Sequence, residues 1–256
     1  MLSICTVKKL DVFAPHESRP SIMSASPIGH NSSDAPLHHK PASIGAVLQV
    51  RAVVFDYGMV LTGPPDPQAY AEMIRITGLS AERFHDLYWA DRPAYDAGHL
   101  TGIEYWQKFD RDAGLNLPQR LLEELNLWDA RYWTTENPVM LAWQLALKQR
   151  GIKTAILSNM GDNVRRHIER EFKWFFRFDV LVWSYELKIV KPDPAIYRYV
   201  LGKLGTAPQE TLFIDDRQVN VDGANALGMI GVTFSTAEAL RSDLAAMGFD
   251  SALPLP

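Results

Sequence analysis

Four groups of polar residues in this sequence each follow a short apolar segment. Together, these residue types could form a catalytic site. The groups are Asp56; Ser158 with Asn159; Lys191; and Asp215 with Asp216. Each residue type alone is common at turns and helix starts. A function therefore depends on whether the fold brings the four groups to one place.

Brought together, these groups would form a site for a metal ion and a phosphate group. Three carboxylates at one point would repel one another unless a cation lay between them. Oxygen ligands with no Cys or His nearby suit Mg²⁺, which keeps water molecules for a substrate phosphate. A lysine and a hydroxyl supply positive charge and a hydrogen bond to phosphate oxygens. A carboxylate beside them could attack phosphorus as a covalent nucleophile.

The apolar segments that precede these residues predict a parallel sheet. Short segments rich in branched apolar residues alternate with helical segments, a pattern typical of an α/β doubly wound sheet. The carboxyl ends of such strands share one edge, where ligands bind. The predicted strands are 51–55, 152–157, 178–183, 211–214 and 230–234.

A long helical pattern interrupts this alternation and predicts an inserted cap. We expect a Rossmann-like core from residues 49–65 and 138–256, and a helical cap domain from residues 66–137. Capping boxes are predicted to begin one cap helix, at Thr101-Gly-Ile-Glu104, and the last core helix, at Ser235-Thr-Ala-Glu238. Four of the seven tryptophans lie in the cap. We expect its aromatic side chains to fill the core of a small bundle, although one or two could face a substrate.

Residues 1–48 differ from the rest of the chain. They hold eight serines, five prolines and four of the seven histidines, and their apolar residues follow neither the strand period nor the helix period. We predict a disordered N-terminal extension. Two alternatives stay open: a targeting peptide, to which Lys8 and Lys9 would contribute charge, and a true start at Met23.

Composition argues against several classes of protein. The 256 residues carry 26 Lys and Arg against 30 Asp and Glu, a net charge of −4, which argues against a basic face for nucleic acid or an anionic membrane. The single cysteine, Cys5, can form no internal disulfide. No uncharged apolar run approaches the ~20 residues that span a bilayer. We expect a cytoplasmic protein that binds neither nucleic acid nor membrane, and the tryptophan-rich cap leaves a homodimer open.

The polar groups and their spacing resemble the haloacid dehalogenase (HAD) superfamily of hydrolases over about residues 50–250. The chain resembles in particular subfamily IA, which has a helical C1 cap after the first strand. The segment Phe213-Ile-Asp-Asp-Arg-Gln-Val-Asn220 is similar to the fourth motif of the family. The resemblance implies that Asp56 forms an aspartyl-phosphate and that Lys191 assists it. The residues implied to bind phosphate are Ser158, Asn159 and Lys191, and those implied to bind Mg²⁺ are Asp56, the carbonyl of Gly58, Asp215 and Asp216.

One position departs from most phosphatases of this family. They carry a general acid–base aspartate two residues after the nucleophile, where this chain has Gly58. General acid–base catalysis contributes about 10²–10⁴-fold, so its loss should matter least for sugar 1-phosphates, aryl phosphates, acyl phosphates and anhydrides. A subgroup resembling the α-glucose-1-phosphate phosphatases also has glycine there. The cap residues that could transfer a proton instead are His85, Asp96, His99 and Glu104.

Three functions are compatible with these residues. We predict a Mg²⁺-dependent phosphatase that acts on a small phosphorylated metabolite. The first alternative is a 2-haloacid dehalogenase, whose nucleophile motif resembles Asp-x-Tyr-Gly-Thr; here Tyr57 and Gly58 stand one position too early, and Asp215 and Asp216 have no use without a cation. The second alternative is a non-catalytic protein of the same fold that binds a metabolite or partner. Gly58 motivates it, but the presence of Asp56 favours an enzyme.

Overall fold

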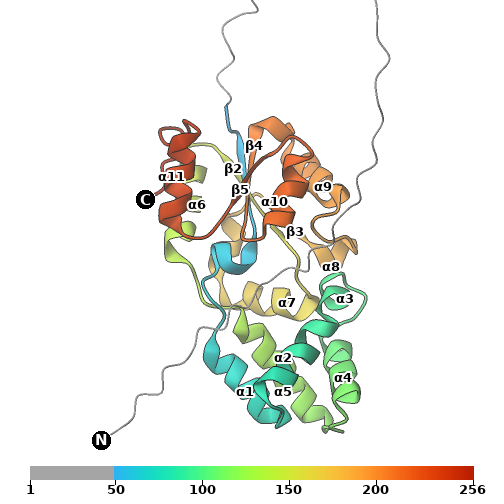
Figure 1. Ribbon diagram of the computed structural model, residues 1–256. Helices are drawn as coiled ribbons and strands as arrows, with labels where there is room; N and C mark the ends of the chain where they lie inside the picture. The colour runs from blue at the N-terminus through green and yellow to red at the C-terminus, as the bar shows by residue number, and fades with distance from the viewer. Residues whose placement is uncertain (1–48) are drawn as a thin grey trace, which may run out of the picture. The chain divides into compact units, whose positions relative to one another are not determined.

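A computed structural model describes residues 49–256 of the chain (Figure 1). The predicted disordered extension, residues 1–48, lies outside the described residues and stays a prediction. Within residues 49–256, no helix is both long enough and apolar enough to cross a membrane.

Five parallel strands form one sheet in the described part of the chain. The strands are β1 (Ala52–Phe55), β2 (Lys153–Ser158), β3 (Val180–Trp183), β4 (Thr211–Asp215) and β5 (Ile230–Thr233). Their order is β3-β2-β1-β4-β5, so β1 is central and pairs with both β2 and β4. The predicted α/β doubly wound sheet is confirmed, and the carboxyl ends of its strands lie at one edge.

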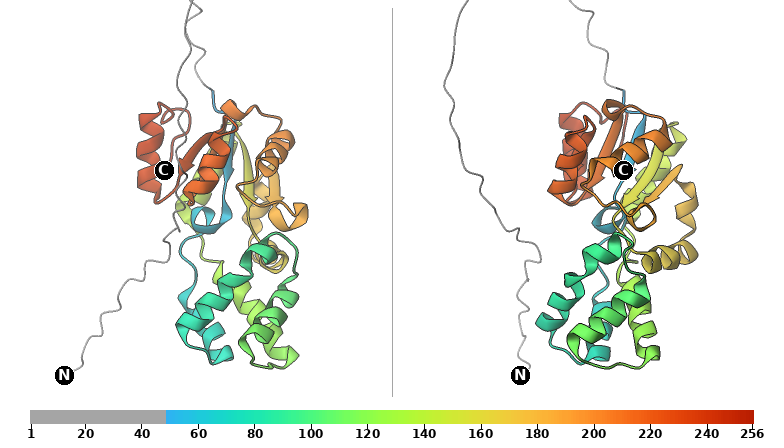
Figure 2. Two further views of the ribbon diagram at one scale, coloured as in Figure 1. Left: turned by 45° about the vertical axis from the view of Figure 1, so that its right-hand side comes forward. Right: turned by 90° about the vertical axis from the view of Figure 1, so that its right-hand side faces the viewer.

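Helices cover both faces of the sheet (Figure 2). The core helices are α6 (Pro138–Gln149), α7 (Asp162–Glu171), α8 (Ser184–Leu187), α9 (Pro194–Leu204), α10 (Gln218–Asn225) and α11 (Ala237–Ala246), with short turns η2 (Lys173–Arg177) and η3 (Pro208–Glu210). Val53 and Phe55 of β1 join α6, α7 and α11 in one apolar cluster, whereas Ala52 and Val54 join α9 and α10 in the other. Because both faces are buried, the strands consist of continuous apolar residues.

Between β1 and α6 the chain forms a turn and five helices. The turn is η1 (Tyr57–Leu61), and the helices are α1 (Pro67–Thr77), α2 (Ala81–Ala90), α3 (Arg92–Asp96), α4 (Gly102–Ala113) and α5 (Gln119–Tyr132). We call residues 66–137 the helical insertion. It lies beyond the carboxyl ends of the strands (Figure 1). Aromatic side chains fill its own apolar cluster, as expected of a small bundle.

One of the two predicted capping boxes is present as expected. The backbone N–H of Thr101 donates to the Glu104 carboxylate at 2.8 Å, and the Thr101 hydroxyl accepts from the backbone N–H of Glu104. The box predicted at Ser235 is wrong by one residue. Thr236 begins α11 instead, because its extended backbone lets its hydroxyl accept from the N–H of Ala239 at 3.1 Å.

Two glycines allow the helical insertion to pack closely on the core. A Cβ atom at Gly161, after β2, would lie 2.1 Å from Cζ of Tyr95 in α3. A Cβ atom at Gly98 would lie 2.3 Å from the carbonyl oxygen of Tyr185 in α8. Any larger side chain at either position would therefore push the two parts of the molecule apart.

Candidate active site

Lys191 lies at the centre of a buried cluster at the carboxyl ends of the strands. Its Nζ is 2.9 Å from Oδ1 of Asp56 and 2.6 Å from Oδ2 of Asp215. All three residues are buried, with exposed fractions of 4% for Lys191, 8% for Asp56 and 0% for Asp215. The fold thus brings together residues from the carboxyl ends of two strands and from the loop before α9.

Asp56 directly follows the central strand β1. Its backbone N–H donates to the carbonyl of Ile214 at 2.8 Å, which continues the pairing with β4. Its Oδ1 accepts a hydrogen bond from the backbone N–H of Tyr57 at 2.7 Å in addition to the contact with Lys191. Its Oδ2 has no hydrogen-bond partner within residues 49–256. One oxygen is therefore fixed, and the other is available to a cation or a substrate.

Three carboxylates meet beside Lys191. Oxygens of Asp56, Asp215 and Asp216 all lie within 4.8 Å of one another. Burial raises the pKa of Asp56 to about 7; Lys191 opposes this shift, and the two other carboxylates add to it. Burial and the neighbouring Asp215 also raise the pKa of Asp216. One lysine cannot balance three carboxylates, so this donor set fits a hard divalent cation such as Mg²⁺.

Asp215, the last residue of β4, has both carboxylate oxygens in hydrogen bonds. Oδ2 accepts from Lys191, and Oδ1 accepts from the backbone N–H of Arg217 and from Nδ2 of Asn220, each at 2.9 Å. Asp216 is only partly buried. Asp216 therefore offers a cation the freer carboxylate of the two.

Lys191 is held in its charged form by its partners. Burial lowers the pKa of a lysine, but Asp215 and Asp56 outweigh that effect and raise the pKa of Lys191 above its ordinary value. A permanent positive charge next to an unpaired carboxylate oxygen suits a site that stabilises phosphate oxygens.

Asn159 binds the backbone of Lys191. Its Nδ2 donates to the carbonyl of Lys191 at 3.0 Å, and its Oδ1 accepts from the Lys191 N–H at 2.8 Å. These two bonds leave the second N–H of Nδ2 unused, so direct contact with a phosphate, the role expected from the sequence, stays a prediction. Ser158, the last residue of β2, is 3% exposed and keeps its hydroxyl at the same edge of the sheet.

Gly58 is not required by the backbone at its position. Its φ of −64° and ψ of 136° are open to any residue. A Cβ atom there would lie 3.8 Å from Cζ3 of Trp133, which is an ordinary contact. The next residue, Met59, has a φ of 60°, a conformation that marks a constrained turn in a non-glycine residue. Steric hindrance at the Cβ therefore does not explain the missing aspartate.

The four candidate proton donors of the helical insertion have different surroundings. Glu104 is exposed and is engaged in its capping box. His99 is exposed, and His85 is partly buried. The Asp96 carboxylate accepts from Nε of Arg92 at 3.2 Å. Within the described residues, no hydrogen bond or ion pair joins any of the four to the predicted nucleophile.

Two buried polar residues near the site were not found from the sequence. The Ser184 hydroxyl accepts from the backbone N–H of Met160 at 2.9 Å and donates to the carbonyl of Asp96, so it joins α3 to the loop after β2. Ser184 directly follows β3, and the strand-end criterion applied to that strand would have identified it. Asn220 holds Asp215 through its amide.

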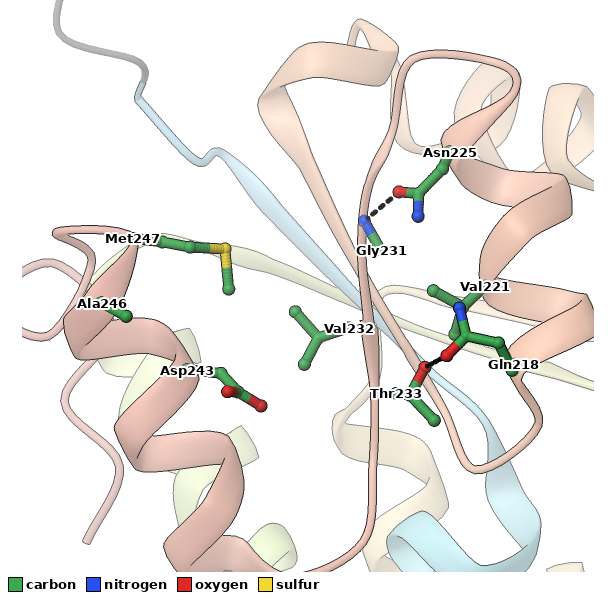
Figure 3. Close-up of a pocket in the computed structure, with 9 residues that line it drawn as sticks. All are labelled: Gln218, Val221, Asn225, Gly231, Val232, Thr233, Asp243, Ala246 and Met247. Atoms are coloured by element: carbon green, nitrogen blue, oxygen red, sulfur yellow. Dashed lines mark hydrogen bonds between the residues drawn. The ribbon is translucent and has the colours of Figure 1, made fainter.

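A separate cavity of about 360 Å³ lies between α10, β5 and α11 (Figure 3). Gln218, Val232 and Asp243 are among the residues that line it, and none of the predicted site residues does. The cavity lies beside the edge strand β5. It is therefore distinct from the cluster around Lys191.

Comparisons with known proteins agree with the fold. Residues 50–228 match the model of the haloacid dehalogenase-like hydrolase family. (S)-2-haloacid dehalogenase 1 of a Pseudomonas species is 30% identical over 188 residues, which is 70% of this chain and 82% of that protein. A phosphatase of Mycobacterium tuberculosis is 26% identical over 211 residues, which is 78% of this chain and 96% of that protein.

Some relatives are much longer than the matched region. Bifunctional epoxide hydrolase 2 of the mouse is 31% identical over 143 residues, which is 54% of this chain but only 26% of that protein. This chain therefore spans about a quarter of the length of that curated relative. The activities of the whole relative do not follow from such a match.

Solved structures share the fold. The crystal structure of a HAD family enzyme from Bacteroides thetaiotaomicron, in complex with magnesium and inorganic phosphate, aligns with a TM-score of 0.60 and 22% identity over 73% of this chain and 94% of that one. At this identity the likeness shows the fold alone. The relatives include phosphatases and dehalogenases, so the choice between these two chemistries depends on the residues of the site.

Proposed function

Because this chain belongs to the haloacid dehalogenase-like hydrolase family, we propose that it is a Mg²⁺-dependent phosphatase that cleaves a small phosphorylated metabolite through an aspartyl-phosphate. The observation that carries the proposal is the group of three carboxylates, Asp56, Asp215 and Asp216, whose oxygens lie within 4.8 Å of one another. A dehalogenase acting on a haloacid has no use for this group, since the extra carboxylates would repel the carboxylate of its substrate.

The proposed reaction begins at the free oxygen of Asp56. Its Oδ1 is held by Lys191 and a backbone N–H, which leaves Oδ2 to attack phosphorus. As this bond forms, the bond from phosphorus to the leaving-group oxygen breaks; water then hydrolyses the acyl phosphate to inorganic phosphate and restores the carboxylate. Mg²⁺ held by the other carboxylate oxygen of Asp56, the Gly58 carbonyl, Asp215 and Asp216 would offset negative charge on the phosphate oxygens.

Lys191 and Ser158 are the proposed phosphate ligands. The raised pKa of Lys191 keeps its ammonium group charged, and such a charge is most effective where water is excluded. Asp215 binds the ammonium group at 2.6 Å, and Asn159 binds the backbone of the same residue. We assign these two as positioning residues for the lysine.

In this proposal the helical insertion acts as a cap that determines which substrate binds. Its position beyond the strand ends supports that role (Figure 1), since residues on such segments commonly determine specificity. The glycine at position 58 restricts the leaving group, because no carboxylic acid is available there to protonate a simple alkoxide. Esters of weakly basic leaving groups are therefore the proposed substrates.

The test is phosphate release from a panel of aryl phosphates, sugar 1-phosphates and acetyl phosphate, measured with Mg²⁺ and with EDTA. Release should require Mg²⁺ and should fall by roughly 10⁴-fold or more in Asp56→Asn, because the nucleophile is lost. Asp243→Asn is the matched control, since Asp243 is an exposed carboxylate outside the cluster.

Two outcomes would contradict the phosphatase. Halide release from (S)-2-chloropropionate in EDTA, lost in Asp56→Asn, would assign the dehalogenase instead. No release from any phosphate or haloacid would assign a protein that binds a metabolite or a partner without turnover.

A further inference from the structure

Trp133 lies against the segment that carries the predicted nucleophile. Its Cζ3 and Cε3 are 3.8 and 4.0 Å from the point where a Cβ atom would stand at Gly58. Apart from the adjoining residues and the backbone of its own turn, no other atom of residues 49–256 lies within 4 Å of that point. The Tyr57 hydroxyl donates to the carbonyl of Trp133 at 2.7 Å. The hydrocarbon edge of an indole therefore faces the position from which an acidic side chain would otherwise project.

The polar end of the indole fixes this orientation. Nε1 of Trp133 donates to the hydroxyl of Tyr88 at 3.3 Å. The guanidinium carbon of Arg92 lies 5.7 Å from the centroid of the ring. Tyr88, which accepts from the indole N–H, and Arg92, which lies near the ring, both belong to the helical insertion. The apolar edge of the indole is therefore the part that faces Gly58.

Trp89 extends this apolar surface. Its ring centroid lies 6.4 Å from that of Trp133, edge to face at 82°. Both indoles are partly exposed, whereas Trp106 and Phe84 of the same insertion are fully buried. We call Trp133 and Trp89 the indole pair. The indole pair keeps part of its apolar surface exposed, and Trp133 lies beside Gly58, two residues after Asp56.

We propose that the indole pair binds a planar aromatic leaving group, so that the preferred substrates are aryl phosphates. This inference rests on the proposed function. As the bond from Asp56 to phosphorus forms, the bond from phosphorus to the phenolic oxygen breaks, and its electron pair leaves with the phenolate, which is protonated by water. A phenolate departs without the acid that Gly58 lacks.

The indole pair also favours an aromatic ring over a sugar. The edge of Trp133 that faces Gly58 carries neither a donor nor an acceptor for a sugar hydroxyl. Buried hydroxyl groups without partners weaken binding. An aromatic ring loses no hydrogen bonds on such a surface and gains a ring–ring contact.

The test compares two phosphates that both have weakly basic leaving groups but differ in shape. 4-Nitrophenyl phosphate carries a ring, and acetyl phosphate carries none. The readout is the ratio of kcat/KM for the first to that for the second, measured on the full chain with Mg²⁺. Trp133→Leu should lower this ratio by about five- to tenfold, the size of a ring–ring contact. Trp133→Phe, which keeps a ring, should retain most of the ratio.

Trp128→Leu is the matched control. It removes another indole of the insertion, which lies 4.8 Å from the guanidinium carbon of Arg131, and it should leave the ratio unchanged. If Trp133→Leu does not fold by circular dichroism, Trp89→Leu and Trp133→Phe supply the same ratio.

The outcomes separate this inference from the proposed function. A ratio unchanged in Trp133→Leu, an equal fall in Trp128→Leu, or a wild-type preference for glucose 1-phosphate over 4-nitrophenyl phosphate would overturn the role of the indole pair while acetyl phosphate is still cleaved. If the wild type cleaves no phosphate at all, the phosphatase proposal fails, and the inference fails with it.

Discussion

Lys191 in the core and Arg92 in the helical insertion are both buried cations. Their side chains are 1% and 6% exposed, and each forms ion pairs with two carboxylates at 3.2 Å or less. In burial and pairing the two clusters are alike. They differ in what surrounds them, and that difference separates a site that can do chemistry from one that holds helices together.

Aromatic rings enclose the Arg92 cluster. The guanidinium carbon lies 5.1 Å from the ring centroids of Tyr88 and Tyr95 and 6.0 Å from that of Tyr105. Asp129 accepts from Arg92 at 2.8 Å and from Tyr88 at 2.6 Å. Its Oδ2 is buried without a hydrogen-bond partner among the described residues. This carboxylate therefore depends on Arg92, and the cluster with its enclosing rings joins four helices of the insertion, α2 to α5.

The Lys191 cluster has three carboxylates beside one cation, one more than the two that pair with Arg92. Asp216 is partly exposed at the strand ends, and Oδ2 of Asp56 has no hydrogen-bond partner in the described part of the chain. A buried ion pair with a raised carboxyl pKa is therefore weak evidence for an active site, since both clusters have one. An excess of carboxylates at an accessible edge is the stronger sign.

The largest effect is expected from removing the cation of the core. Lys191→Met should lower kcat/KM for acetyl phosphate by at least about 10³-fold, because the phosphate loses its charged ligand. Phosphate release measures the loss. Lys203→Met, at an exposed lysine of α9, should keep the wild-type rate. Activity within tenfold of the wild type in Lys191→Met would place the chemistry elsewhere.

Removing the cation of the insertion should act on stability. Arg92→Met should lower the free energy of unfolding by about 3–5 kcal/mol, since it leaves buried carboxylates without a partner. Denaturant unfolding measures this change. Arg120→Met breaks an exposed pair with Glu124, at 3.4 Å, and should cost about 1 kcal/mol or less. Equal losses of unfolding free energy in the two variants would contradict a structural role of the Arg92 cluster.

Adding a carboxylic acid beside the Lys191 cluster should increase its activity, which no change in the Arg92 cluster is expected to do. Gly58→Asp should raise the turnover of a simple alkyl phosphate by about 10²-fold, because it supplies a general acid at a position whose backbone accepts any residue. Steady-state kinetics with glycerol phosphate measure the gain. Gly58→Asn occupies the same space without titrating and should show none, so an equal rate in both variants contradicts the acid–base explanation.

Magnesium should stabilise the protein through the core cluster. At a concentration about 100 times its Kd, a ligand specific to the folded state adds about 2.7 kcal/mol to the free energy of unfolding. The melting temperature should therefore rise with added Mg²⁺ and fall back with EDTA. Asp216→Asn should lose this response and Asp243→Asn should keep it. A wild-type melting temperature that does not change with added Mg²⁺ would argue against the metal site.

The smallest effect concerns the pH dependence of stability. Burial raises the pKa of Asp96 to about 6; Arg92 opposes the shift, and Asp129 adds to it. The folded protein therefore holds a proton that the unfolded chain has lost, and the stability from this group is greatest below its ordinary pKa and is lost as the pH rises through about 6. In Asp96→Asn the free energy of unfolding should lack this fall of about 1–3 kcal/mol. Denaturant unfolding at pH values below 5 and above 7 checks it, and parallel curves for variant and wild type would contradict it.

The sequence predicted the sheet well because strands depend on local pattern. Each of the five strands lies within two residues of its predicted bounds. Asp56, Ser158 and Asp215 stand at strand ends, as expected, and parallel strands bring such ends to one edge. The exact start of α11 was missed because two adjacent hydroxyl residues, Ser235 and Thr236, can both begin a helix, and only the backbone conformation selects one.

Contacts between distant segments were not predictable in the same way. The two hydrogen bonds between the Asn159 side chain and the Lys191 backbone depend on how two loops pack together. That the edge of Trp133 faces Gly58 follows from the packing of the insertion on the core. No periodicity of the sequence encodes either distance.

By itself, the sequence determined the order of the strands along the chain and the polar residues that each strand end carries, because covalent order and hydrophobic period are local. Only the tertiary structure decided that Asp215 is fully engaged while Asp216 is freer, that Arg92 is enclosed by rings, and that an indole faces Gly58. These features depend on how far apart segments lie after packing, and packing is a property of the whole fold.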